Sequence, residues 1–138
     1  MSRAARIQKD MPSWQPKPQP WLRDKGHLKW IGGFICIFCG RVGCSVAAHI
    51  RTGGDGAMGR KPGDNRVLPI CGFPRMPIGI IGCHEIQHSK GELSFWSDFM
   101  ARGGPDPVGI ADALWKVSGD TEAGERIIFR ARQMLRAA

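Results

Sequence analysis

Five cysteines, at positions 36, 39, 44, 71 and 83, limit the ways in which this chain can fold. The N-terminal residues MSRAARIQKDMPSW are basic and lack the apolar stretch of a secretory signal. We therefore expect a reducing cytoplasm, where cysteines bind metal more often than they form disulfides. The odd number of cysteines also argues against a disulfide framework and fits four ligands with one to spare.

The segment CIFCG at residues 36–40 has the spacing of a zinc knuckle, in which two thiolates on a tight turn reach one tetrahedral ion. We expect a structural Zn²⁺ with four thiolate ligands: Cys36, Cys39, Cys71 and Cys83. Cys44 is then a buried small side chain. The second pair is unusually far apart, so two alternatives stay open. Cys44 or His27 replaces one ligand, or the four cysteines are unconnected core residues.

A chain of 138 residues allows one domain with one modest hydrophobic core. Residues 1–29 are expected to form a basic arm, because the prolines between Pro12 and Pro20 forbid a regular helix and favour extended backbone. Residues 30–100 are expected to form a core that a structural zinc ion holds together. Residues 101–138 are expected to form a C-terminal helical extension.

Positive charge is concentrated near the N-terminus. The formal net charge is +8, and residues 1–30 contain seven Lys/Arg against Asp10 and Asp24. A polyanion is the natural partner, with nucleic acid ahead of a membrane surface because no amphipathic basic helix accompanies the charge. No apolar run approaches the roughly 18 residues that span a bilayer. Trp14 and Trp21 either pin the arm to the domain or stack on bases.

The apolar pattern predicts an α+β fold. A short strand is expected from Leu28 into the turn at 36–40, and a second strand from Ser45 to Ile50. Glycines mark residues 51–66 as a loop before the extended segment VLPIC at 67–71. Helices are expected over 83–103, with a break near Gly91, and in the two tail segments PDPVGIADALWKVSG and GDTEAGERIIFRARQMLRAA.

Two histidines occupy the first of these predicted helices. His84 and His88 are four residues apart, which places them on one helix face about 6 Å apart at Cβ. Two such imidazoles can share a second metal ion. The segment HEIQH also matches the zinc-protease pattern HExxH. That interpretation is the weaker one, because the pair directly follows a cysteine ligand and no third protein ligand follows downstream.

Four segments in this order carry a family resemblance: CIFCG, AAHIR, GRKPGDNRVLPIC and CHEIQHSKGELSFW. A strand ending in His49, a loop with Asn65 and a helix with His84 surround a zinc knuckle. Over about residues 34–96 the chain resembles the HNH endonucleases, and in particular the small phage and prophage proteins that include the recombination-enhancement nucleases. The resemblance implies a small, treble-clef-like ββα-metal core.

The resemblance also implies roles for individual residues. His49 matches the general base that takes a proton from the attacking water, and Asn65 matches the residue that orients the base-bearing loop. His84 matches the ligand of the catalytic ion, and His88 a second helical ligand. The implied activity is one-metal hydrolysis of DNA phosphodiester bonds with Mg²⁺, Mn²⁺, Ni²⁺ or Zn²⁺.

One position departs from the family pattern. Many members carry Asp or His as a further metal ligand just before the general base, where this chain has Ala48. We expect Asp64 or Asp55 to supply a carboxylate, or water and phosphate to complete the shell, or His49 to be a ligand itself. Three cations on the adjacent glycine-rich loop are expected to bind flanking phosphates: Arg51, Arg60 and Lys61.

Two other classes of function compete with the nuclease. One is a non-catalytic, zinc-bound DNA-binding module, in which Ala48 marks a lost metal site. The other is a recombination or packaging accessory that acts only beside a recombinase or a phage terminase. DNA is the expected partner, and a recombinase or a phage terminase would be a second one for an accessory protein. A phage or prophage origin would place the protein in the cytoplasm of a bacterial host, and the oligomeric state is open.

Overall fold

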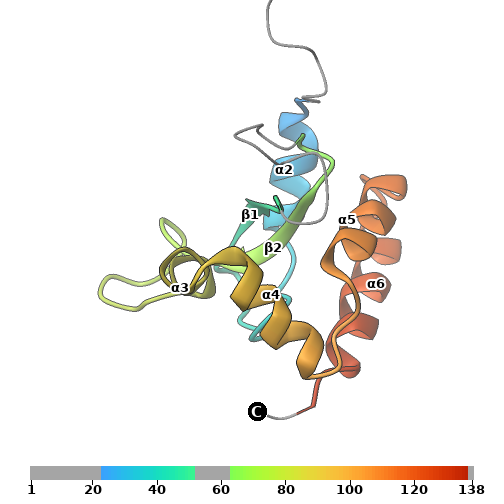
Figure 1. Cartoon of the computed structure of the whole chain (residues 1–138). Coiled ribbons are helices and arrows are strands. Elements are labelled where there is room, and N and C mark those ends of the chain that lie inside the picture. Colours follow the sequence, from blue (N-terminus) through green and yellow to red (C-terminus); the bar gives the residue numbers. More distant parts are fainter. Residues whose placement is uncertain (1–22, 52–62, 137–138) are drawn as a thin grey trace, which may run out of the picture.

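A computed structural model describes residues 23–51 and 63–136 and confirms an α+β architecture. A two-stranded antiparallel sheet occupies the centre, with α2 above it, α3 to one side, α4 below, and α5 and α6 paired on the opposite side from α3 (Figure 1). The elements in chain order are α2 Lys25–Gly32, β1 Ser45–His49, β2 Val67–Cys71, α3 Cys83–Lys90, α4 Glu92–Ala101, α5 Pro107–Lys116 and α6 Thr121–Gln133.

The segment before the knuckle is helical, so the predicted strand from Leu28 is wrong. Asp24 caps α2 by accepting a hydrogen bond from the backbone N–H of His27 at 2.9 Å. His27 and Ile31, four residues apart, are both buried on one face of this helix. α2 also takes up residues 25–29, the last five of the expected arm. The rest of that arm, with Trp14 and Trp21, lies outside the described residues.

Strands β1 and β2 lie in segments that the sequence predicts to be extended, and they pair as an antiparallel hairpin. Their register runs from Ser45 opposite Cys71 to His49 opposite Val67. All five residues of β2 are buried. The edge of β2 that faces away from β1 also forms a backbone hydrogen bond, in which the Pro69 carbonyl accepts from Ile37 N–H at 2.9 Å. At about 3.3 Å per residue, this register separates the Cys71 end from the His49 end by roughly 13 Å.

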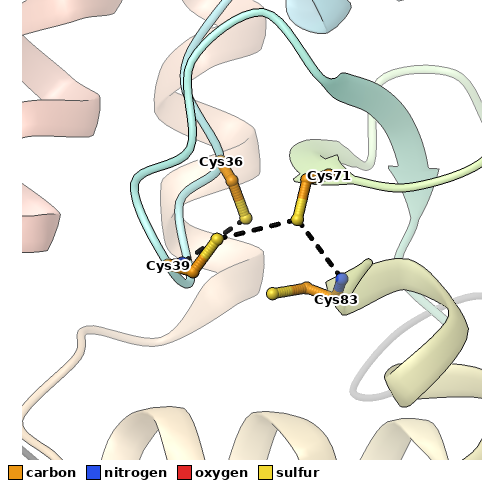
Figure 2. Close-up of side chains that lie close together, drawn as sticks. All are labelled: Cys36, Cys39, Cys71 and Cys83. Carbon is orange, nitrogen blue, oxygen red and sulfur yellow. Dashed lines mark hydrogen bonds between the residues drawn. The ribbon is translucent and has the colours of Figure 1, made fainter. Parts of the chain in front are cut away.

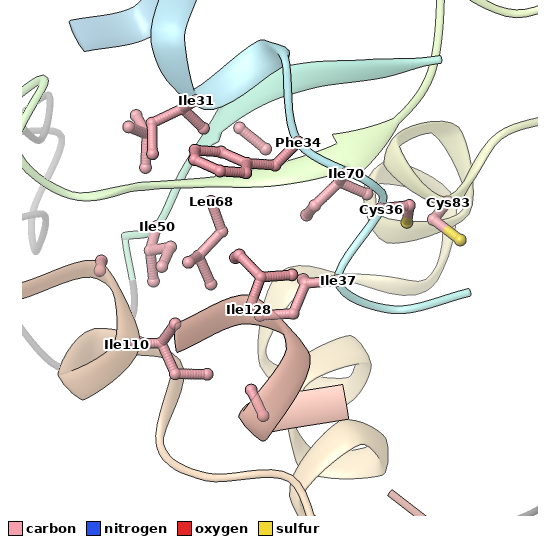
Figure 3. Close-up of a cluster of buried hydrophobic side chains, with 14 of the residues drawn as sticks. Ile31, Phe34, Cys36, Ile37, Ile50, Leu68, Ile70, Cys83, Ile110 and Ile128 are labelled. Atoms are coloured by element: carbon pink, nitrogen blue, oxygen red, sulfur yellow. The ribbon is translucent and has the colours of Figure 1, made fainter. Parts of the chain in front are cut away.

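The core joins the tail helices to the hairpin. Leu68 and Ile70 of β2 meet Ile31 from α2 on one side and Ile110 and Ile128 from α5 and α6 on the other (Figure 3). The C-terminal helices therefore contribute to the same hydrophobic core as the central hairpin.

Helices α3 and α4 follow the predicted pattern, including the break at Gly91. The backbone φ of Gly91 is 98°, a conformation that glycine adopts without steric cost. This residue ends α3 and turns the chain directly into α4. Within the parts of the chain that the structure describes, no helix has the length and apolar character needed to cross a bilayer.

Candidate metal centre and active site

Four cysteines come together from three separate elements, as the sequence predicts. Cys36 and Cys39 lie on the turn before β1, Cys71 ends β2, and Cys83 begins α3 (Figure 2). Their Sγ atoms all lie within 4.8 Å of one another. Zn–S bonds of about 2.3 Å in a tetrahedron would place the sulfurs about 3.8 Å apart. The cluster is thus arranged to hold one metal ion.

Backbone N–H groups point at two of these sulfurs. Cys39 N–H donates to Cys36 Sγ at 3.4 Å, and Cys83 N–H donates to Cys71 Sγ at 3.3 Å. Gly40 completes the turn with a φ of 84°, and its N–H donates to the Cys36 carbonyl at 2.8 Å. The donors to sulfur favour thiolate over thiol, which is the form that binds metal.

The thiols of the cluster differ in acidity because they share hydrogen bonds. A hydrogen bond from the Cys83 thiol lowers the pKa of Cys36 to about 5, against the opposing effect of burial. The same hydrogen bond raises the pKa of Cys83, and burial raises the pKa of Cys71 to about 11. Cys36 therefore ionises more readily than Cys71 and Cys83. Cys44 is half-buried and lies outside the group.

A second site is a pocket of about 440 Å³ between the end of β1 and the helices α3 and α4. It brings together four residues that the sequence predicts for the site, namely His49, Arg51, His84 and His88, with three further residues: Ala47, Gln87 and Glu92. The ring centroids of the two helical histidines lie 4.7 Å apart. The predicted i, i+4 pair is therefore formed and faces the same space as the strand histidine.

The environment of His84 favours its neutral ring. Burial lowers the pKa of His84, and the charge of neighbouring His88 lowers it further, against the opposing effect of Glu85. A neutral imidazole has a lone pair with which to bind a metal ion. Among the described residues, however, only the four cysteines gather three or more ligand atoms closely enough to hold an ion.

His49 is anchored from behind by Asp64. The Nε2 atom of His49 lies 2.9 Å from Oδ1 of Asp64, which is 3% exposed and does not line the pocket. Asp64 therefore contacts the predicted base and is not the pocket's own carboxylate. Asn65, the residue to which the resemblance assigns the orienting role, is half-buried in the turn before β2 and is also outside the lining.

The carboxylate that lines the pocket belongs to Glu92, which the sequence analysis missed. Its Oε2 atom accepts a hydrogen bond from the backbone N–H of Arg51 at 2.6 Å. Ala48, the position at which the chain departs from the family pattern, is 1% exposed and lies in the core. Its side chain is therefore on the opposite face of β1 from His49. The sequence Gly91-Glu92 is typical of a helix N-terminus, and α4 begins there. That local signal does not show that Glu92 lies beside the histidines, because its position in the pocket depends on the turn at Gly91.

Glu85 does not have the position that a protease base requires. Its Oε1 atom accepts from Gly82 N–H at 2.9 Å, and its Oε2 atom from Phe73 N–H at 3.0 Å. It thus holds both ends of the segment between Cys71 and Cys83, and it is not part of the pocket lining. In the HEIQH segment, the two histidines line the pocket, and the glutamate accepts hydrogen bonds from backbone N–H groups.

The remaining predicted residues Asp55, Arg60 and Lys61 lie outside the described residues. No protein-family model, curated protein or solved structure matches this chain. The case for a function therefore depends on the site itself.

Proposed function

We propose that this chain is a metal-dependent endonuclease that hydrolyses phosphodiester bonds of DNA, with the architecture of the HNH family. One observation carries the proposal. His49 from β1 and the pair His84 and His88 from α3 line the same pocket, together with Glu92 and Arg51. The formal net charge of +8 supports a polyanionic substrate.

The chemistry needs a proton acceptor beside the attacking water. As the water oxygen bonds to phosphorus, the bond from phosphorus to the 3′ oxygen breaks, and that oxygen leaves and takes up a proton. The water's own proton passes to a base. His49 has a side chain that is 27% exposed at the pocket, and histidine is suited to this transfer near neutral pH.

The pocket also offers donors for a catalytic cation. His84 and His88 would supply two nitrogen ligands, and water and phosphate oxygens would complete the shell of a divalent metal such as Mg²⁺, Mn²⁺, Ni²⁺ or Zn²⁺. Such an ion would stabilise the charge that develops on the phosphate and on the leaving oxygen. Arg51, at the edge of the same pocket, would bind a flanking phosphate by charge.

The cysteine cluster would hold a structural Zn²⁺. Its four ligands are all sulfur, and the sulfur separations suit a tetrahedral zinc ion. Four protein ligands complete that shell and leave no position for water or substrate. The cluster would therefore fasten the ββα unit while the histidine pocket performs the reaction.

The test is cleavage of supercoiled plasmid by the purified protein with each of the four metals added. We expect metal-dependent cleavage that falls about 10²–10⁴-fold in His49→Ala, the range for loss of a general base. His84→Ala should lose cleavage as well. Ser89→Ala is the matched control, because Ser89 lies on the same helix, is exposed, and is not part of the pocket lining.

Other outcomes point to other functions. A protein that binds zinc and DNA but cleaves with none of the metals would be a binding module. Cleavage that appears only when a recombinase or terminase is added would indicate an accessory protein. Cleavage that is unchanged in His49→Ala would show that the base is another residue.

A further inference from the structure

Asp64 is a buried carboxylate with three contacts and no exposure to the pocket. Its Oδ1 atom lies 2.9 Å from Nε2 of His49, and its Oδ2 atom accepts a hydrogen bond from Asp24 N–H at 2.7 Å. The Arg23 guanidinium lies 3.8 Å from Oδ1. The Asp64 side chain is 4% exposed. A carboxylate this buried is costly unless its oxygens are satisfied, and here both oxygens have partners.

These contacts determine the charge of Asp64. Burial by itself would raise the pKa of this carboxyl group. The hydrogen bonds from His49 and from Asp24 N–H, together with the charges of His49 and Arg23, outweigh burial, so the pKa lies below its ordinary value. Asp64 is thus ionised at neutral pH, and an ionised carboxylate can only accept hydrogen bonds.

The acceptor character of Asp64 determines which nitrogen of His49 carries a proton. Because Oδ1 cannot donate, Nε2 must be the protonated nitrogen in the contact between these two residues. The neutral ring then has its lone pair on Nδ1. A ring held in this way is oriented and restricted to one tautomer, which is the role that a carboxylate behind a catalytic histidine performs in other hydrolases.

We propose that Asp64 is the positioning residue of the pocket, which holds His49 through Nε2–H so that Nδ1 accepts the proton of the attacking water. The second half of this statement rests on the proposed nuclease function, and the first half does not. After the transfer the carboxylate would also stabilise the imidazolium, since the two groups would then be an ion pair at hydrogen-bond distance.

The N-terminus of α2 holds this carboxylate in place. The side chain of Asp24 caps the helix, and its backbone N–H binds Asp64. One residue therefore connects the start of α2 to the carboxylate behind the base. The resemblance assigns the orienting role to Asn65, and the contacts assign it to the preceding residue.

The test that does not depend on activity is a long-range ¹H–¹⁵N NMR spectrum of the full chain with ¹⁵N-labelled histidine. We expect the His49 ring to be the Nε2–H tautomer, with its ring proton protected from exchange by the bond to Asp64. The spectrum of His49→Gln identifies the signals. In Asp64→Asn the Asp24 N–H should bind the amide oxygen at the Oδ2 position, so that the NH₂ group faces Nε2. The protected proton should then disappear and the Nδ1–H tautomer should appear.

A wild-type ring in the Nδ1–H form would overturn the proposal, and that measurement requires no variant to fold. An unchanged ring in a folded Asp64→Asn would overturn it as well. The matched control is Asp112→Asn, which removes a carboxylate 3.7 Å from Arg66 that does not line the pocket. This control should leave the His49 signals unchanged.

Cleavage assays then test the catalytic half. Asp64→Asn should lower kcat about 10²–10⁴-fold with little change in KM, metal content or the spectrum of α3, while Asp112→Asn should retain activity. An Asp64→Asn enzyme of wild-type kcat would refute the positioning role. If the wild-type protein cleaves no DNA, the nuclease proposal fails, and the tautomer spectrum still decides the contact between Asp64 and His49.

Discussion

His27 and His49 are both held through one ring nitrogen, but their surroundings differ. His27 is 2% exposed, its Nδ1 atom lies 2.6 Å from Ser118 Oγ, and its ring packs edge-on against Trp115 at a centroid distance of 4.8 Å. Its Nε2 atom is buried without a hydrogen-bond partner. Burial lowers the pKa of His27 by more than Asp24 and Asp64 raise it. His27 is therefore a neutral core residue, and the cysteine cluster does not include it.

This environment predicts a pH dependence of stability. Because the pKa of His27 is lowered on folding, the unfolded chain, with a pKa of about 6.5, takes up a proton on His27 at a higher pH than the folded chain does. The free energy of unfolding should therefore fall as the pH drops below about 6.5, by at most about 1.4 kcal/mol per pH unit from this residue. Urea unfolding between pH 7 and pH 5 measures the slope.

In His27→Gln the loss of stability between pH 7 and pH 5 should be smaller than in the wild type, whatever the variant's stability at pH 7. Because His84 also has a lowered pKa, part of the slope should persist. Equal slopes in the two proteins would mean that His27 titrates alike in the folded and unfolded states.

At the scale of the elements, the cysteine cluster connects parts of the chain that are distant in sequence. The turn at 36–40, the end of β2 and the first residue of α3 all meet there. α3 is short, at eight residues, and isolated helices of this length are unstable in water. A metal ion in the cluster would hold α3, and with it His84 and His88, against the hairpin.

Removal of the metal should therefore unfold this part of the protein. Structural zinc binds zinc-finger peptides with about 10–16 kcal/mol, and whole domains are stable by about 5–15 kcal/mol. We expect one zinc per chain, and a large drop in Tm in strong chelator or in Cys71→Ser. Cys44→Ser is the control, because Cys44 lies outside the cluster and should keep both zinc and Tm. Equal Tm values with and without metal would contradict a structural role.

Two helix glycines should respond to alanine in opposite directions. A Cβ at Gly109 in α5 would meet nothing closer than 4.0 Å, so Gly109→Ala should stabilise the protein by about 0.5–1 kcal/mol through helix propensity. A Cβ at Gly124 in α6 would lie 2.5 Å from the Phe34 ring. Gly124→Ala should cost about 1–3 kcal/mol through overpacking. Chemical unfolding of both variants measures the difference, and equal signs would show that α6 does not pack closely on Phe34.

At the scale of the whole molecule, the excess positive charge and the hydrophobic core are found in different parts of the chain. The basic excess lies near the N-terminus, whereas the hydrophobic core extends from α2 through the hairpin to α6. The tail helices share that core, so residues 30–100 and 101–136 are joined by one set of buried side chains. We expect the N-terminal charge to act on nucleic acid and the C-terminal helices to act on stability.

The full chain with Arg3→Gln and Arg6→Gln tests this division. DNA affinity should fall, and the slope of log K against log salt should decrease by about 0.9 for each phosphate that the protein no longer neutralises. Arg126→Gln with Arg130→Gln is the charge-matched control on α6, where both arginines are exposed. Fluorescence anisotropy across a salt series measures both pairs. Equal reductions in affinity would mean that DNA responds only to net charge.

Local patterns in the sequence determined the cysteine spacing, the hairpin strands, the break at Gly91 and the helical pair of His84 and His88. Each depends on neighbours a few residues away, on the period of apolar residues, or on a glycine conformation. The same patterns failed at α2, because the apolar residues around Ile31 fit a strand as well as a helix until the cap at Asp24 is considered.

Only the tertiary structure decided which side chains surround His49. Its partner Asp64 is 15 residues away, Asp64 is held by a residue 40 positions away, and the contact between Arg51 and Glu92 spans 41 positions. No local pattern encodes such pairs, since they depend on how the hairpin, α2 and α4 pack together. The sequence thus determined which chemical groups are available, and packing decided which of them meet, because hydrogen bonds require contacts of about 3 Å between residues that the chain itself leaves far apart.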